Sequence, residues 1–265
     1  MSLILHISDS HLFADERSEL KGMRTRGSFR AVLQHAYDMY PEPDVIILGG
    51  DMAQDESAQA YRIVAEMLYA FDWKAPVMIS PGNHADMDLL QANLIPALQA
   101  GSSYSDHLQL GAWQVLTLST HEKGNVGGNI SEEELARLRS LLSATAGKQT
   151  LLALHHHPVA IGSLWLDEIG LNNRDQLWIL LAEFPQVKAL LCGHIHQNFD
   201  RVYQGVRVIG SPSTCIQFAP GKDDFGMDDV SPGYRWLSLS DDGIMTGVER
   251  VEGFIPADLN NTELY

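Results

Sequence analysis

Apolar residues along the chain gather into short runs, and segments with helical spacing separate these runs. A short apolar run without alternation predicts a strand that is buried on both faces. Five such runs occupy residues 3–7, 45–48, 77–80, 150–154 and 187–192. Because strands of this kind alternate with helices in layered proteins, the pattern favours the α/β fold class.

The segments around these strands predict four helices. Apolar residues recur at spacings of three and four within residues 29–40, 61–71, 135–142 and 177–184, which places them on one face of each helix. Ser131 and Glu134 have the spacing of a capping box, and this pair predicts where the third helix begins.

Beyond residue 200 the spacing of apolar residues changes from helical to alternating. Residues 201–203 and 206–209 flank Gln204-Gly205 and predict a β-hairpin; residues 234–239 and 247–251 predict further strands. The acidic segment 223–229 is interpreted as a solvated loop rather than a site. Because no repeat, low-complexity tract or Pro/Ser-rich linker interrupts the sequence, we expect residues 1–265 to form a single domain.

The composition narrows the possible classes of protein. With 265 residues, 45% of them hydrophobic, the chain can bury a substantial core. Its 34 acidic and 18 basic residues give a net charge of −16, which argues against nucleic acid as a partner. Cys192 and Cys215 are too few for a disulfide framework and are expected to be small buried hydrophobes. The sequence has neither an export signal nor a membrane-length apolar run, so we predict a cytoplasmic protein without a membrane partner.

Polar clusters follow the predicted strands, and they hold many of the eleven histidines. The clusters are Asp9-Ser10-His11, Gly49-Gly50-Asp51, Pro81-Gly82-Asn83-His84, His155-His156-His157-Pro158 and Gly193-His194-Ile195-His196. In open α/β sheets, ligands bind beyond the carboxyl ends of the strands. We therefore expect the five clusters to converge on one site.

Taken singly, each cluster also has a plainer interpretation. The glycine-containing clusters are typical of turns, and adjacent histidines are often packed and hydrogen-bonded in a core. Gly193-His194-Ile195-His196 is more specific, because residues two apart on an extended segment face the same side. The coincidence of five such clusters at strand ends favours a metal site.

The types of ligand indicate two metal ions. Histidine nitrogens, carboxylate oxygens and an amide oxygen suit Mn, Fe or Zn, whereas a structural zinc site would need more cysteine. If one of the three adjacent histidines binds, the clusters supply more donors than a single metal ion can use while it keeps one coordination position open. Two ions that share a carboxylate can hold a bridging hydroxide and polarise a phosphoryl group, so the pattern favours hydrolysis of phosphoesters.

In this order, the motifs D-x-H, G-D, G-N-H, a histidine before H-P and G-H-x-H resemble the calcineurin-like metallophosphoesterase superfamily. The resemblance implies a four-layer α/β/β/α sandwich, with two mixed β-sheets flanked by helices. Further segments are similar to the bacterial class III 3',5'-cyclic AMP phosphodiesterases. They are residues 12–15, 50–55, 155–158, 191–197, 212–218 and 231–237.

The resemblance also implies which residues hold the metals and the substrate. One ion would take Asp9, His11, Asp51 and His196, and the other would take Asp51, Asn83, His155 and His194. Asp51 would bridge the ions, and His155 is chosen over His156 and His157 by analogy alone. The substrate phosphate would lie against His11, Asp51, Asn83, His84 and His196. His84 would protonate the leaving oxygen, for which an imidazole is suited.

One departure from the family pattern concerns the residue after His84. The family has an acidic residue there, whereas this chain has Ala85 followed by Asp86. The change leaves the metal ligands untouched and bears on the orientation of His84. Asp86 is the candidate replacement.

Several functions are compatible with this pattern. The leading prediction is hydrolysis of 3',5'-cyclic AMP to AMP, by in-line attack of a metal-bridging hydroxide. The alternative is a phosphodiesterase of broader specificity, acting on glycerophosphodiesters or other small phosphoesters. A phosphomonoesterase also stays open, because monoester and diester specificity depend on the loops around the metals, and loops 86–91 and 124–129 would shape the rim of the site. A non-catalytic scaffold predicts eroded ligands, which this sequence does not have, and a nuclease would need a basic surface. The sequence assigns no oligomeric state.

Overall fold

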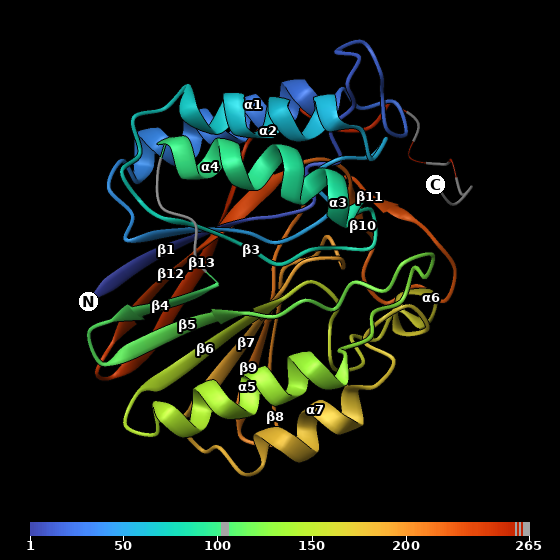
Figure 1. Ribbon diagram of the computed structural model, residues 1–265. Helices are drawn as coiled ribbons and strands as arrows, with labels where there is room; N and C mark the ends of the chain where they lie inside the picture. The colour runs from blue at the N-terminus through green and yellow to red at the C-terminus, as the bar shows by residue number, and fades with distance from the viewer. Residues whose placement is uncertain (102–105, 258, 260, 262–265) are drawn as a thin grey trace.

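The structure is a computed structural model that describes residues 1–101, 106–257, 259 and 261. Two mixed β-sheets lie face to face, and helices cover the outer face of each sheet (Figure 1). The predicted α/β/β/α sandwich is therefore confirmed.

The first sheet has the strand order β13-β12-β1-β2-β3. Its parallel strands are β1 (Ser2–Ile7), β2 (Val45–Leu48) and β3 (Val77–Ile79), and the antiparallel pair β12 (Gly233–Ser240) and β13 (Gly243–Arg250) extends it beyond β1. Helices α1 (Thr25–Met39), α2 (Ala58–Tyr69) and α4 (Ile95–Gly101) cover it. The short α3 (Met87–Leu89) and the π-helical η1 (Leu90–Leu94) lead directly into α4.

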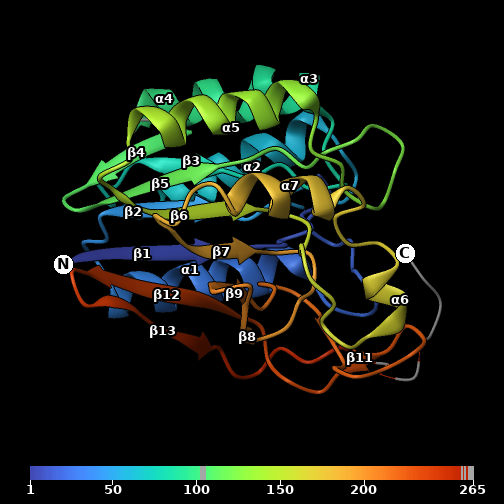
Figure 2. The same ribbon diagram turned by 90° about the horizontal axis from the view of Figure 1, so that it is seen from below.

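The second sheet has the order β4-β5-β6-β7-β9-β8. The strands β5 (Trp113–Thr117), β6 (Gln149–Leu154), β7 (Val187–Cys192) and β9 (Val206–Gly210) are parallel, and β4 (His107–Leu110) and β8 (Phe199–Tyr203) are antiparallel edges. Helices α5 (Glu132–Ala144) and α7 (Arg174–Leu181) cover it. Figure 2 shows α6 (Leu164–Asp167) and β11 (Met227–Asp228), which pairs with β10 (Gln217–Phe218), at the end of the molecule where β7 ends.

The alternation of side chains along each strand builds three layers of core. In β1, Ile4 faces the other sheet, whereas Leu5 faces the helices, since the two belong to separate buried clusters. In β6, Leu151 joins the cluster between the sheets and Leu152 joins the cluster under α5 and α7. Both faces of these strands are buried, which explains why the sequence has continuous apolar runs there.

Most local predictions are confirmed. The five apolar runs are strands, the four helical segments are helices, and the predicted hairpin is β8–β9. Gln204 and Gly205 have φ values of 48° and 82°, as a tight hairpin turn with two left-handed residues requires. Ser131 accepts a hydrogen bond from the backbone N–H of Glu134 at 3.1 Å, so half of the predicted capping box is present. The Glu134 carboxylate instead accepts the backbone N–H of Ser119.

Three interpretations are wrong or incomplete. Residues 86–91 are not a loop, because Asp86 caps α3 and residues 87–91 form α3 and the start of η1. The acidic segment 223–229 is only partly solvated, since Phe225 and Met227 are buried within it. Strands β4 and β5 were not predicted. In β5, the buried Gln114 interrupts the apolar pattern, and its amide is satisfied by Thr145 and Thr150 at 2.6 and 2.9 Å.

Candidate metal centre

The five predicted clusters meet where the strands of both sheets end. Asp9, Asp51 and Asn83 follow strands of the first sheet, whereas His155 and His194 follow strands of the second. Backbone hydrogen bonds from Asp9 to the Gly50 carbonyl and from His11 to the Asp51 carbonyl, of 3.0 and 2.9 Å, join the first two loops. Across the sheets, the backbone N–H of His194 donates to the Asp9 carboxylate.

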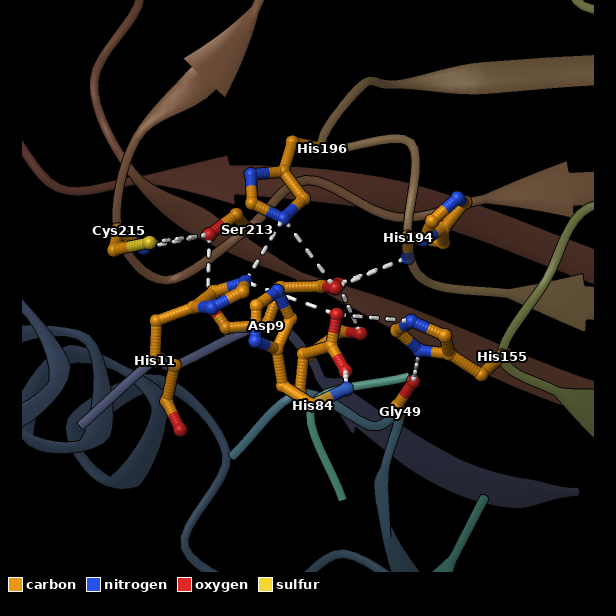
Figure 3. A network of polar contacts seen from close by, with 12 residues as sticks. Asp9, His11, Gly49, His84, His155, His194, His196, Ser213 and Cys215 are labelled. Carbon is orange, nitrogen blue, oxygen red and sulfur yellow. Dashed lines mark hydrogen bonds and ion pairs between the residues drawn. The ribbon is translucent and has the colours of Figure 1, made fainter. Parts of the chain in front are cut away.

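Several predicted ligands have left-handed backbone, which non-glycine residues rarely adopt. The φ values are 56° at Asp9, 45° at His11, 44° at Asp51, 65° at His194 and 48° at His196. Each such residue costs about 1–3 kcal/mol, and such residues concentrate at functional sites. Figure 3 shows the side chains of Asp9, His11 and His196 directed toward one another.

Two glycines give the cluster its room. A Cβ at Gly50 would lie 2.2 Å from Nδ1 of His155, and a Cβ at Gly82 would lie 2.1 Å from Oδ1 of Asp51. Gly50 also has a φ of +102°. A larger residue at either glycine would therefore displace the side chain beside it, His155 in one case and Asp51 in the other.

His11 and His196 face each other through the same ring atom. Nδ1 of His11 donates to Oε1 of Gln54 at 2.6 Å, and Nδ1 of His196 donates to the Ile216 carbonyl at 2.8 Å. In a neutral imidazole the other nitrogen is then an acceptor. These two acceptors, both Nε2, lie 3.3 Å apart, and that of His196 lies 3.4 Å from Oδ1 of Asp9. Such a group of lone pairs is what a cation requires.

The same arrangement recurs at His155. Its Nδ1 donates to the Gly49 carbonyl at 2.7 Å, and its Nε2 lies 3.1 Å from Oδ2 of Asp51. His194 lies beside it, with ring centroids 5.1 Å apart, and donates from Nε2 to the Ile169 carbonyl at 3.0 Å. Its Nδ1 is consequently the acceptor. Oδ1 of Asn83 is buried without a hydrogen-bond partner in the described part of the chain.

Asp51 lies between these two groups of ligands. A carboxylate oxygen of Asp51 lies within 4.8 Å of ring nitrogens of His11 and His84 in one group; in another it lies within 4.8 Å of a carboxylate oxygen of Asp9 and a ring nitrogen of His155. Oδ1 of Asp51 also accepts the backbone N–H of His84 at 2.9 Å. The residues present fit two cations that share this carboxylate.

Burial and charge set the protonation of these groups without metal. Burial lowers the pKa of His11 to about 3, and burial and neighbouring imidazoles lower that of His194. Burial opposes the charged form of His155, but the attraction of Asp51 outweighs it and raises the pKa to about 9. Burial likewise opposes ionisation of Asp51, but the attraction of His155 holds its pKa well below the ordinary value. A proton shared by His155 and Asp51 thus occupies the place of a cation.

The other two adjacent histidines have different surroundings. His156 lies near His155 but is held by the Thr120 hydroxyl at 2.7 Å and the Val126 carbonyl at 3.0 Å, as expected for a packed, hydrogen-bonded residue. His157 stacks on His194, with centroids 5.8 Å apart, and its Nε2 lies 3.6 Å from Oδ1 of Asp167.

His84 lies at the edge of the cluster and is partly exposed. Its ring contacts that of His11 edge to face, with centroids 5.1 Å apart. Asp86, the candidate replacement for the acidic neighbour, accepts the backbone N–H of Leu89 at 2.9 Å and so caps α3. The side chain of Ala85 is buried.

Two cavities meet at His84. One, of about 330 Å³, is lined by Asn83, His194 and His196 together with aromatic residues. The other, of about 620 Å³, is also lined by Asn83 and His84, and extends along residues 85–88, His121 and residues 123–126. Part of each predicted rim segment, 86–91 and 124–129, lines this second cavity. A substrate bound at the cluster therefore has two cavities beside it.

Comparison with known proteins decides the family. Residues 2–198 match the family model of the calcineurin-like phosphoesterases. The chain belongs to this family.

Close relatives of this calcineurin-like phosphoesterase are found among curated bacterial proteins. It is 39% identical to a 3',5'-cyclic adenosine monophosphate phosphodiesterase, CpdA, of Pseudomonas aeruginosa, over 96% of this chain and 91% of the relative. It is 42% identical to the protein of the same name from Escherichia coli, over 92% and 87% of the two chains.

A solved structure has the same fold as this calcineurin-like phosphoesterase. A dimetal phosphatase from Danio rerio matches with a TM-score of 0.71 and 15% identity, over 94% of this chain and 96% of that one. Among the described residues, no helix is long and apolar enough to cross a membrane.

The sequence did not assign a role to every residue that shapes this site. Gln54, which fixes the His11 ring, and the aromatic residues Trp165 and Phe225 of the smaller cavity had none. No motif contains these aromatic residues, because the two segments that carry them, α6 and the segment near β11, are far apart in the sequence and meet only in the folded chain.

Proposed function

We propose that this chain is a metal-dependent phosphodiesterase that hydrolyses 3',5'-cyclic AMP to AMP. The observation that supports this proposal best is the buried cluster in which ring nitrogens of His11, His196 and His155 and the carboxylate of Asp51 lie 3.1–4.0 Å from one another. Near-full-length similarity to cyclic AMP phosphodiesterases supports the choice of substrate. The complete set of ligands argues against a non-catalytic scaffold.

We assign the seven predicted ligands to two divalent ions, for which Fe and Mn are the preferred candidates and Zn is also suited. When bound, such ions polarise phosphoryl oxygens and acidify a water molecule for in-line attack. Asp9, His11, Asp51 and His196 would hold one ion, and Asp51, Asn83, His155 and His194 would hold the other. Gln54, Gly49, Ile169 and Ile216 fix the tautomers of the ligating rings.

His84 is the proposed proton donor. It lies beside the ligands yet is partly exposed, so its ring can reach a phosphodiester bound there. The backbone N–H of His84 donates a hydrogen bond to the Asp51 carboxylate, and this bond fixes where the loop begins. We propose that protonated His84 delivers its proton to the 3' oxygen as that oxygen leaves. His11, Asp51, Asn83 and His196 complete the phosphate site.

The wider second cavity favours one alternative, a phosphodiesterase of broader specificity acting on glycerophosphodiesters or other small phosphoesters. At about 620 Å³ it could receive a second ester group larger than a ribose ring. The manganese-loaded protein should therefore be assayed with cyclic AMP and with bis(p-nitrophenyl) phosphate. We expect the higher kcat/KM with cyclic AMP, and a far higher value with the synthetic ester would contradict the assignment.

We also propose that residues 1–265 form a single catalytic domain, because one buried cluster includes strands of both sheets. The net charge of −16 favours a small anionic substrate over nucleic acid. A cytoplasmic location stays a prediction.

A further inference from the structure

The smaller cavity beside the metal cluster has an aromatic wall. We call the space bounded by Trp165, Phe218 and Phe225 the aromatic pocket; it has a volume of about 330 Å³. Ile169 and Val126 add aliphatic surface to it. Pockets of this kind bind flat, largely apolar groups and use a few polar atoms to orient them.

The three rings pack against one another and against a metal ligand. Trp165 lies edge to face with Phe218 and Phe225, with centroid distances of 5.0 and 5.1 Å. Phe218 stacks on His196 with centroids 4.0 Å apart and planes only 5° from parallel. The aromatic pocket is therefore directly next to the proposed phosphate site.

Backbone hydrogen bonds fix the two segments that carry these rings. The N–H groups of Leu164 and Trp165 donate to the carbonyls of Lys222 and Asp223 at 3.0 and 3.1 Å. The backbone N–H of Gly221 donates to the Ser163 hydroxyl at 3.0 Å. The wall is thus held together independently of any ligand, which lowers the entropy cost of binding.

One polar atom in this wall lacks a partner. Nε1 of Trp165 is buried and makes no hydrogen bond in the described part of the chain. A buried indole N–H ordinarily has an acceptor. Because this N–H is closed to solvent, the wall presents ring surface to the pocket and not this donor.

We propose that the aromatic pocket binds the base of the cyclic nucleotide, with Trp165 and Phe225 as specificity-determining residues. This inference rests on the proposed function, which places the phosphate at the neighbouring metal cluster. The neutral, flat base then contacts the aromatic rings. The pocket thereby distinguishes a nucleotide from a diester that has no base.

The test compares cyclic AMP with the same 3',5'-cyclic phosphate on a ribose that carries no base. For Phe225→Leu and Trp165→Leu, kcat/KM for cyclic AMP should fall about 5- to 150-fold, the usual range for loss of a base–aromatic contact. For the base-free analogue it should stay within about twofold. Trp165→Phe keeps an aromatic ring, and should lower kcat/KM for cyclic AMP less than Trp165→Leu does.

Tyr203→Leu is the matched control, because Tyr203 packs on Trp178 away from the pocket. It should leave both substrates unaffected. If the pocket variants lose activity equally with both substrates, the rings only support the cluster and the inference is wrong. Unchanged activity with cyclic AMP would overturn it as well.

A binding measurement separates this inference from the proposed function. 2-Aminopurine riboside 5'-monophosphate fluoresces, and stacking on aromatic rings quenches it. We expect quenching by the manganese-loaded protein and weaker quenching by Phe225→Leu. If wild type hydrolyses neither cyclic phosphate, the proposed function fails, and this quenching still decides whether a base binds in the pocket. Equal quenching by wild type and Phe225→Leu refutes the inference alone.

Discussion

Nε2 of His11 lies 3.3 Å from Nε2 of His196, and both atoms are hydrogen-bond acceptors. The tautomers follow from Gln54 and Ile216, which accept from Nδ1 of the two rings. Two lone pairs facing each other in a buried site are unfavourable until a cation or a proton lies between them. The folded, metal-free chain therefore contains an unfavourable contact between these two nitrogens, and metal binding would relieve it.

We expect metal to stabilise the fold. A ligand that binds only the folded state adds about 2.7 kcal/mol to the free energy of unfolding at 100 times its Kd. Chelator-treated protein should consequently unfold at a lower denaturant concentration, and manganese should restore the midpoint. A midpoint that manganese does not move would contradict the metal centre.

Gln54→Ala should weaken metal binding by about 10- to 100-fold, the usual effect of losing the partner that orients a ligating histidine. The physical reason is that Nδ1 of His11 loses its acceptor at 2.6 Å. Gln54→Glu, which keeps an acceptor at this position, is the control and should bind metal nearly as well as wild type. Isothermal titration with Mn²⁺ measures both variants, and equal affinity of the alanine variant and wild type would refute this role.

Gly82→Ala should lose metal although it adds only a methyl group. The new Cβ would lie 2.1 Å from Oδ1 of Asp51, so that carboxylate must move. Gly147→Ala is a matched control, since a Cβ there meets nothing within 4 Å and neither glycine has left-handed backbone. Elemental analysis of the two purified variants should find metal depleted in the first and unchanged in the second.

Local structure could be predicted from the sequence, because strands with two buried faces have continuous apolar runs. The division of these strands between two sheets could not. Val45–Leu48 and Val187–Cys192 look alike as apolar runs, yet they belong to different sheets. Which strands pair depends on contacts between residues far apart in the chain, and a single sequence does not report such contacts.

The ligand residues were named from their motifs, whereas the atoms that bind were not. Which ring nitrogen of His11 is the acceptor depends on Gln54, which lies 43 residues further along the chain. The aromatic pocket depends likewise on Trp165 and Phe225, which no motif connects. The left-handed backbone at Asp9 and His196 is also a property of the folded loops and not of the residue types.

His84→Ala should keep the metals and lose turnover. General acid catalysis contributes about 10²- to 10⁴-fold, so kcat for cyclic AMP should fall within that range. A better leaving group needs less protonation, so p-nitrophenyl esters should lose less activity than cyclic AMP. Elemental analysis provides the check on metal content. Undiminished turnover with cyclic AMP would remove His84 from the proposed mechanism.

Between about pH 6.5 and 9, the stability of the metal-free protein should fall as pH rises, whereas that of the metal-loaded protein should stay level. His155 has its pKa raised to about 9, because the attraction of Asp51 outweighs burial, whereas an unfolded histidine titrates near ~6.5. The folded, metal-free protein thus holds an extra proton, and its stability should fall as pH rises from about 6.5 to 9. Manganese must displace that proton, so its stabilisation should grow over the same window. Denaturant midpoints measured against pH test this, and His155→Gln should abolish the slope of the metal-free protein; equal slopes in the two forms of wild type would contradict the shared proton.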